Sequence, residues 1–171
     1  MLSKKLEKAI NEQINAEFWS AHLYLSMSAW FAEQNLPGFS NWMYVQYKEE
    51  DTHALKFFRY VNERSGRVEL HPIEAVPFEW KNPVDAFQAT LDHERVVTAK
   101  IYKIMELALE EKDYATVSFL QWYVNEQVEE EATAEDYLNK LKMIENNAAA
   151  MYAMDGELAQ RTFTDATLTN E

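Results

Sequence analysis

Apolar side chains recur every three or four residues along four long stretches of this sequence, and this spacing limits the fold more than any other feature. Residues spaced in this way lie on one face of an α-helix. The chain has only three glycines and four prolines in 171 residues, too few for the many tight turns of a sandwich, a barrel or a doubly wound sheet. We therefore predict an all-α fold with long helices over about residues 3–34, 39–65, 83–111 and 114–145.

The breaks between these stretches predict how the helices connect. Residues 35–38, Asn-Leu-Pro-Gly, form a short turn. Residues 67–81 lose the periodicity, contain two X-Pro pairs and are long enough to run the length of a bundle, so the third helix can lie parallel to the second. Asn82 and Asp113 are suited to cap the third and fourth helices. The prediction is a four-helix up-down bundle (about 3–146) with a long crossover.

The C-terminal part of the chain predicts two further features. A short fifth helix is expected over about residues 148–160, where Met151, Met154 and Leu158 recur at helical spacing. Residues 161–171 are expected to form a flexible tail. Because no linker or repeat divides the sequence, residues 1–171 are expected to form a single domain.

Charge and composition exclude several kinds of partner and chemistry. The formal net charge of −13 would repel nucleic acids and anionic lipids but attract cations. The chain has no cysteine, so any metal must be held by oxygen or imidazole ligands. Aromatic residues make up 13% of the chain, which favours an oligomer with aromatic interfaces. The charged N-terminal residues do not fit a secretory signal, so a soluble, cytoplasmic protein is expected.

One glutamate interrupts the apolar stripe near the middle of each long helix: Glu17, Glu50, Glu94 and Glu130. In a bundle these four side chains would share one layer. Burying a carboxylate costs several kcal/mol, and neighbouring like charges raise one another's pKa. No lysine or arginine shares the stripe near this layer, and His53 provides its one imidazole. A bound metal is the simplest source of compensating charge.

The residue types in the layer indicate which metal it would hold. Carboxylates with one imidazole suit iron or manganese better than zinc, and they exclude copper(I). Glu50 and His53 form a Glu-x-x-His pair, which places both side chains on one face of the helix and is a known feature of di-iron bundles. Such a pair also arises by chance in acidic helices. Its coincidence with three further mid-stripe carboxylates favours a site with two metals.

Two interpretations stay open for the residues around the layer. Glu49, Glu126 and Glu129 lie one residue or one turn from layer residues, and they form either a third, more exposed cation site or an ordinary solvated acidic face. Tyr24 lies two turns after Glu17 on the same stripe. It either hydrogen-bonds a metal ligand or supplies an electron, or it is a core ring whose hydroxyl is satisfied.

The sequence resembles the haem-free bacterial ferritins over nearly its whole length. The matching motifs are Asn-Glu-Gln-x-Asn-x-Glu ending at Glu17, Glu49-Glu50-x-x-His53-Ala54, His93-Glu94 and Asn125-Glu126-Gln127-x-Glu129-Glu130. The resemblance implies that Glu17 and His53 hold a first iron, Glu50 bridges, and Glu94 and Glu130 hold a second.

The resemblance also assigns the residues beside the layer. It implies that Gln127 hydrogen-bonds close to the iron pair and that Glu49, Glu126 and Glu129, with Glu130 shared, form a third iron site. A bacterioferritin would repeat Glu-x-x-His on the fourth helix and carry a haem-binding methionine just after the second-helix glutamate. This chain has Gln127-Val128-Glu129-Glu130 and Asp51-Thr52 at these places, so no haem is expected.

The function implied by the resemblance is iron storage with ferroxidase activity. Fe(II) would be oxidised to Fe(III) by dioxygen or hydrogen peroxide and stored as a ferric mineral in a shell of twenty-four identical subunits. An alternative is a di-metal enzyme that retains its metals, such as an oxidase or a manganese catalase. A helical bundle without metal is the remaining possibility.

Overall fold

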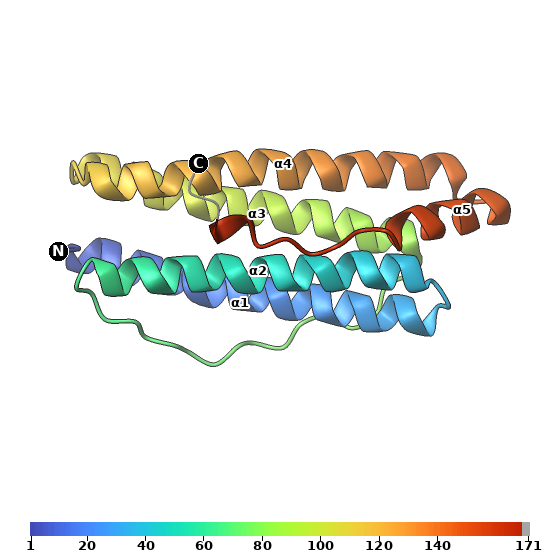
Figure 1. Cartoon of the computed structure of the whole chain (residues 1–171), viewed down its shortest axis with the longest axis horizontal. Coiled ribbons are helices and arrows are strands. Elements are labelled where there is room, and N and C mark those ends of the chain that lie inside the picture. The colour runs from blue at the N-terminus through green and yellow to red at the C-terminus, as the bar shows by residue number, and fades with distance from the viewer. Residues whose placement is uncertain (169–171) are drawn as a thin grey trace.

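The computed structural model describes residues 1–168 and confirms an all-α, ferritin-like architecture (Figure 1). Four long helices lie side by side, a short fifth helix follows, and the described chain ends in one 3₁₀ turn. Their bounds are α1 (Lys4–Glu33), α2 (Pro37–Glu63), α3 (Pro83–Glu110), α4 (Tyr114–Ile144), α5 (Ala148–Leu158) and η1 (Ala166–Leu168). Among the described residues, no helix combines the length and apolar character needed to cross a membrane.

Polar side chains define where four of the helices begin. Each accepts a hydrogen bond of 2.8–3.1 Å from the backbone N–H three residues ahead, which satisfies a donor that the helix itself leaves free. These capping residues are Ser3, Asn82, Asp113 and Asn147. The predicted caps at Asn82 and Asp113 are confirmed.

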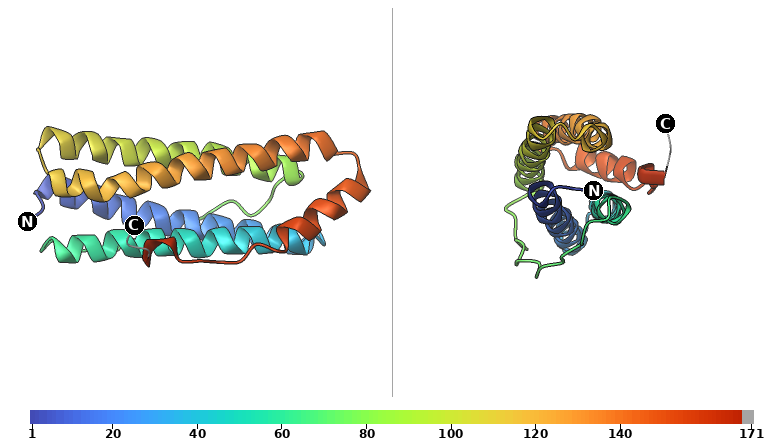
Figure 2. Two further views of the ribbon diagram at one scale, coloured as in Figure 1. Left: turned by 45° about the horizontal axis from the view of Figure 1, so that its top comes forward. Right: turned by 90° about the vertical axis from the view of Figure 1, so that its left-hand side faces the viewer.

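The crossover between α2 and α3 runs the length of the bundle, as the sequence predicts. It passes beside α1 and carries the chain back to the end where α2 begins, so α3 runs parallel to α2 (Figures 1 and 2). Asn11 of α1 fixes one part of it, donating to the carbonyl of Arg67 at 2.9 Å and accepting from the N–H of Glu69 at 2.7 Å. Ser26 holds another part by donating to the carbonyl of Pro77 at 2.7 Å.

Helix α5 folds back from the end of α4 onto the start of α2 (Figure 2). The first residues of α2 have no capping side chain from Leu36. Asp155 of α5 takes that role, and its Oδ1 accepts from the N–H groups of Gly38 and Phe39 at 2.8 and 3.0 Å. A Cβ atom on Gly38 would lie 1.7 Å from the carbonyl oxygen of Asp155. The close approach of α5 to α2 therefore requires glycine here.

The apolar core consists of two clusters, one toward each end of the bundle. The cluster nearer α5 includes Leu23, Met27, Phe31, Phe39, Trp42, Phe87, Leu91, Leu138 and Leu158. The cluster nearer the α3–α4 turn includes Leu6, Ile10, Ile14, Phe57, Val97, Ile101, Leu120 and Tyr123. The mid-helix glutamates fall between the two clusters on every long helix. The apolar ends therefore hold a polar layer in the middle of the bundle.

The segment after α5, which the sequence predicts to be a flexible tail, makes polar contacts with α2. Residues 161–168 extend along α2 (Figure 1), and residues 169–171 lie outside the described residues. Arg161 pairs with Glu49 at 2.6 Å, and Thr167 accepts a hydrogen bond from Arg59 at 3.1 Å. Local sequence does not reveal these polar partners on α2.

Replacing Asp155 with alanine should lower the stability of the metal-free protein by about 1–2 kcal/mol, because two N–H groups at the start of α2 lose their acceptor. Thermal and denaturant unfolding would measure this change. The matched control is Asp136→Ala, which removes an exposed carboxylate whose described partner is Lys140. Equal stability of the two variants would show that the contact between α5 and α2 contributes little.

Candidate metal centre

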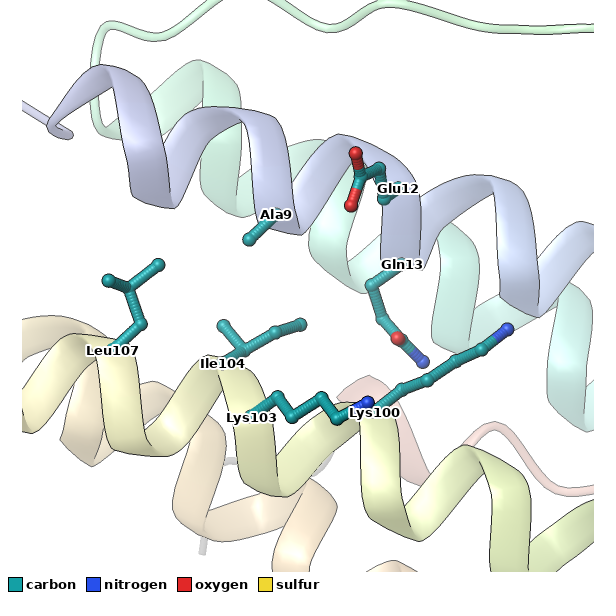
Figure 3. A pocket seen from close by; sticks show the side chains of 7 residues that line it. All are labelled: Ala9, Glu12, Gln13, Lys100, Lys103, Ile104 and Leu107. Carbon is teal, nitrogen blue, oxygen red and sulfur yellow. The ribbon is translucent and has the colours of Figure 1, made fainter.

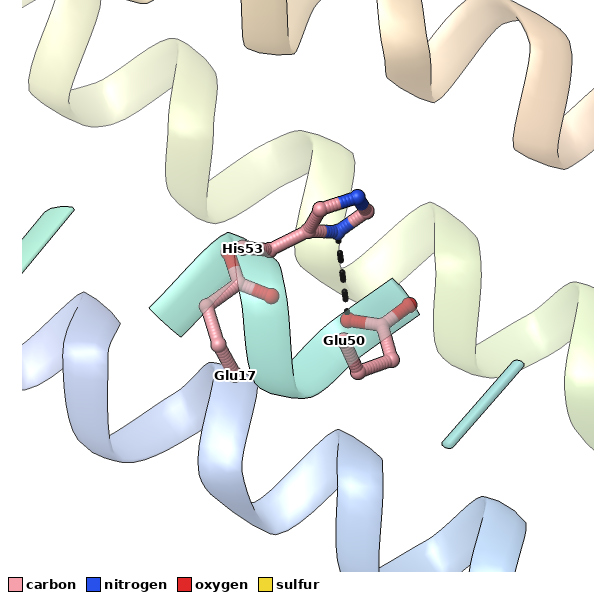
Figure 4. A group of neighbouring side chains, drawn as sticks. All are labelled: Glu17, Glu50 and His53. Atoms are coloured by element: carbon pink, nitrogen blue, oxygen red, sulfur yellow. Dashed lines mark ion pairs between the residues drawn. The ribbon is translucent and has the colours of Figure 1, made fainter. Parts of the chain in front are cut away.

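The predicted ligands of the first metal come together in the middle of the bundle. Glu17 of α1 and Glu50 and His53 of α2 each present a ligand atom, and these atoms all lie within 4.8 Å of one another (Figure 4). His53 Nδ1 lies 3.6 Å from Glu50 Oε2. All three residues are at most 3% exposed. Helices α1 and α2 thus form a compact, nearly water-free group of oxygen and nitrogen donors.

Glu94 and Glu130 complete the layer from α3 and α4. Both are buried. Burial raises the pKa of Glu50, and the charges of Glu94, Glu17 and Glu130 raise it further, so the four carboxyl groups lie close enough to interact. Among residues 1–168, Glu94 and Glu130 do not join the tight group formed by Glu17, Glu50 and His53. The structure therefore brings all five predicted ligands into one layer. Glu17, Glu50 and His53 form a close group, and Glu94 and Glu130 lie farther from it.

Burial is the main cause of the raised pKa values of Glu50, Glu94 and Glu130. It raises the pKa of Glu94 to about 7, and it raises the pKa of Glu130 to about 8 with a further contribution from the charge of Glu94. The pKa of Glu50 is raised well above its usual range by burial and by the neighbouring carboxylates. A cation in the layer would reverse this effect, because it favours the ionised carboxylates.

Two carboxylate oxygens in the layer have no hydrogen-bond partner. They are Oε2 of Glu17 and Oε2 of Glu50, and both are buried. Buried polar atoms normally have partners, so an atom without one calls for an explanation such as an ion. The free oxygens belong to the residues that form the compact group with His53. The donor set is two carboxylates and an imidazole, which fits iron.

Comparison with known proteins identifies the family to which this geometry belongs. Residues 7–144, which include the four long helices almost completely, match the family model for the ferritin-like domain. The chain belongs to the ferritin family. Because the match covers more than half of the chain and includes all four mid-helix glutamates, it supports the resemblance seen in the sequence motifs.

Relatives of this ferritin-family chain match it over nearly its whole length. The bacterial non-heme ferritin of Staphylococcus aureus strain MRSA252 is 39% identical over 165 residues, which cover 96% of this chain and 99% of the relative. The bacterial non-heme ferritin of Staphylococcus epidermidis is 41% identical, with the same shares covered.

Solved structures of ferritins share the fold closely. An engineered closed form of the Archaeoglobus fulgidus ferritin has 52% identity and a TM-score of 0.95, and the match covers 96% of this chain and 100% of that one. An open pore ferritin from the same hyperthermophilic archaeon has 50% identity and a TM-score of 0.94, covering 95% of this chain and 100% of that one.

Tyr24 and Gln127 both hydrogen-bond to Glu94. The Tyr24 hydroxyl donates to Oε1 of Glu94, and Gln127 Nε2 donates to Oε2 at 3.1 Å. Burial, followed by the charge of Glu94, raises the pKa of Tyr24 well above its usual range, so the phenol keeps the proton that it donates. These contacts place Gln127 beside the layer. They also favour the reading of Tyr24 as a residue that positions a candidate ligand.

Two further glutamines position layer carboxylates, a role that the sequence alone does not reveal. Gln13 Nε2 donates to Oε1 of Glu17 at 2.8 Å, and Gln46 Nε2 donates to Oε2 of Glu130 at 2.8 Å. Both glutamines are at most 2% exposed. In the sequence, each of these glutamines stands on an otherwise apolar stripe, four residues before a buried glutamate. Only the three-dimensional structure shows that Gln46 reaches across to α4.

The three acids beside the layer share a small cavity. Glu49, Glu126 and Glu129 line a space of about 150 Å³ together with Glu130, Thr133 and Arg161. His53 Nε2 lies 3.9 Å from Glu126 Oε1, so the cavity adjoins the buried layer. This arrangement differs from an acidic face that is fully solvated, because Glu49 and Glu126 are only partly exposed and burial raises the pKa of each.

A larger cavity on the α1–α3 side is a different kind of space. It has a volume of about 480 Å³, and Lys100 and Lys103 stand on its α3 wall opposite Glu12 and Gln13 (Figure 3). Gln13 also donates to Glu17, so one side chain links this cavity to the acid layer. Two lysines disfavour cation binding here. The candidate metal centre is therefore the layer itself.

The metal-free protein should lose stability as the pH rises from 6.5 to about 8.5. In the unfolded chain these carboxyl groups are already ionised, whereas folded Glu94 and Glu130 keep protons up to pH values of about 7 and 8. The folded state thus binds more protons, and the free energy of unfolding falls as the pH increases. His93 opposes this fall only near pH 6.5, where the unfolded imidazole still binds protons, whereas burial lowers the pKa of folded His93 to about 4 and keeps it neutral.

Glu130→Gln should flatten this pH dependence, and Glu135→Gln serves as the control because Glu135 is exposed. Denaturant unfolding of the metal-free variants at several pH values would measure the slope. A wild-type stability that rises across this range would contradict the protonated state of the layer.

Proposed function

We propose that this chain stores iron and acts as a ferroxidase, oxidising Fe(II) to Fe(III) at the acid layer. The proposal rests on one observation, the buried group of Glu17, Glu50 and His53, in which Oε2 of Glu17 and Oε2 of Glu50 have no hydrogen-bond partner. Membership of the ferritin family and relatives named bacterial non-heme ferritin support it. The ferric product would leave the layer and be stored as a hydrated mineral inside a shell of identical chains.

The layer has enough donors for two Fe(II) ions. Glu17 and His53 would bind the first, Glu94 and Glu130 the second, and Glu50 would lie between them as the bridge. The carboxyl groups of Glu94 and Glu130, with pKa values of about 7 and 8, would release protons as the ions bind. Binding of Fe(II) should therefore be weaker at low pH.

The oxidation step balances with two irons and one oxidant molecule. Each Fe(II) gives up one electron, and two electrons with two protons convert dioxygen to hydrogen peroxide. If hydrogen peroxide is the oxidant, two electrons and two protons convert it to two molecules of water. Anionic carboxylates stabilise Fe(III) relative to Fe(II), so the ligand set favours oxidation.

The residues around the ligands would keep the carboxylates in place during this step. Tyr24 and Gln127 orient Glu94, and Gln46 orients Glu130. Each contact is a hydrogen bond to a carboxylate, a charge-assisted contact stronger than a neutral one. Carboxylate ligands held by amides and a phenol suit a site that binds iron, oxidises it and then releases it.

Glu49, Glu126 and Glu129, with Glu130 shared, are proposed to form a third iron site. These residues line one small cavity next to His53. Because the cavity is more exposed than the layer, an ion bound there should exchange more readily. Such a site would lie between the oxidation centre and solvent.

The assembly is proposed to be a shell of twenty-four chains in the cytoplasm, each chain forming one domain. Large apolar side chains are exposed on the isolated chain, including Leu25, Tyr44, Val96, Tyr102, Leu109 and Tyr114. Exposed apolar surface of this kind is typical of subunit interfaces.

Size-exclusion chromatography with light scattering should give a particle of about twenty-four chain masses, as the apolar faces are buried between subunits. The pure, metal-free protein is suitable for this measurement. A monomer or dimer across a range of protein concentrations would contradict the proposed shell.

Glu50→Ala and His53→Ala should each slow Fe(II) oxidation by at least about tenfold, because each removes a ligand of the proposed centre. The measurement starts with anaerobic protein and Fe(II), admits air and follows the formation of Fe(III) by absorbance. Glu106→Ala and His71→Ala remove the same residue types from exposed positions and should leave the rate unchanged. Equal rates in all five proteins would exclude this layer as the oxidation centre.

Iron content after loading separates storage from an enzyme that retains two metals. A storage protein should hold many more than three irons per chain once it has been given excess Fe(II) and air. A content that stops at two per chain would favour the di-metal enzyme.

A further inference from the structure

Arg161 places a positive charge in the cavity lined by Glu49, Glu126 and Glu129. Its Nη2 lies 2.6 Å from Glu49 Oε2, and its side chain lines the same cavity as Glu126, Glu129 and Glu130. Burial raises the pKa of Glu130, and the charge of Arg161 offsets a small part of this rise. Among the described residues, Arg161 is the one cationic side chain that lines this space.

The arginine is held there by specific contacts with α2. Asn41 Nδ2 donates to the carbonyl of Arg161 at 3.0 Å and to that of Leu158 at 3.2 Å. The guanidinium lies over the ring of Trp42, 4.5 Å from its centre, and Nη1 donates to the Trp42 carbonyl at 3.4 Å. The side chain of Arg161 is 25% exposed. Hydrogen bonds to backbone carbonyls, the cation–π contact with Trp42 and the ion pair with Glu49 together hold the guanidinium beside the acids.

We propose that Arg161 is a tethered cation that competes with a metal ion for the acid cluster of Glu49, Glu126, Glu129 and Glu130, and so sets the affinity of this third site. The proposal rests on the proposed function, in which this cluster binds iron. The guanidinium already occupies Oε2 of Glu49, one of the carboxylate oxygens that an arriving cation would use. Charge repulsion between them opposes simultaneous binding.

Competition works in both directions. If Arg161 weakens metal binding, a bound metal must weaken the docking of Arg161 by the same factor. The residues on either side of Arg161, 159–168, would then loosen from α2 as the site fills. The contact between Thr167 and Arg59 lies farther along the segment and does not involve the acids. The filling of the third site is thereby linked to the position of the C-terminal segment.

Calorimetric titration of the assembled, iron-free protein with Zn²⁺ tests the proposal without any oxidation step. Arg161→Gln should bind the third Zn²⁺ on the order of tenfold more tightly than wild type, the size of a typical coupling between sites. The ions of the buried layer should bind with unchanged affinity. Arg161→Lys keeps a cation on the tether and should retain weak third-site binding. Arg59→Gln removes an arginine contact to the same segment away from the acids, and it should bind like wild type.

Hydrogen exchange gives a second readout that does not depend on a variant folding normally. In the wild-type protein, Zn²⁺ at a concentration that fills the third site should speed amide exchange in residues 159–168. In Arg161→Gln the exchange in this segment should no longer respond to the metal. Unchanged third-site affinity in Arg161→Gln, or slower exchange in wild type with Zn²⁺, would overturn the proposal.

The same titration distinguishes this proposal from the proposed function. If Glu50→Ala binds Zn²⁺ as wild type does, the buried layer is not a metal centre and the proposed function fails. If Glu50→Ala loses the buried ions but Arg161→Gln leaves the third affinity unchanged, only the role of Arg161 is wrong.

Discussion

Four carboxyl groups buried between two apolar clusters are the constraint on which the rest of the structure depends. Ionised, uncompensated acids would be strongly unfavourable at this depth. The raised pKa values of Glu94 and Glu130 show one way to accommodate them, which is to keep protons. A metal ion is the other way, because it supplies charge of the opposite sign and uses the free oxygens of Glu17 and Glu50. Metal uptake at the layer would therefore release the protons of these carboxyl groups.

The long helices make such a layer tolerable. Each helix contributes apolar residues to the clusters on both sides of its glutamate. Packing at the two ends therefore stabilises a bundle in which the buried carboxyl groups of the middle layer are unfavourable. The positions of the acids are then fixed by hydrogen bonds from other helices, such as Tyr24 to Glu94 and Gln46 to Glu130. A stable scaffold can therefore hold a site that is unfavourable by itself, as is common at functional sites.

Sequence predicts those parts of this structure that depend on local spacing. The apolar stripes predict the four long helices. The mid-stripe glutamates and His53 predict the layer, because the position of a residue along its helix determines its height in the bundle. Contacts between distant segments were not predictable in this way. The cap that Asp155 provides for α2, the reach of Gln46 to α4 and the pairing of Arg161 with Glu49 all join residues more than eighty positions apart. No local pattern marks them.

Whether iron occupies the layer can be tested with crystals of the assembled protein soaked anaerobically in Fe(II), with diffraction data collected at the iron absorption edge. We expect anomalous density in the layer, with one iron between Glu17 and His53, a second between Glu94 and Glu130, and Glu50 shared by both. Iron bound only at surface acids, with the layer carboxyl groups in the same positions as without metal, would contradict it.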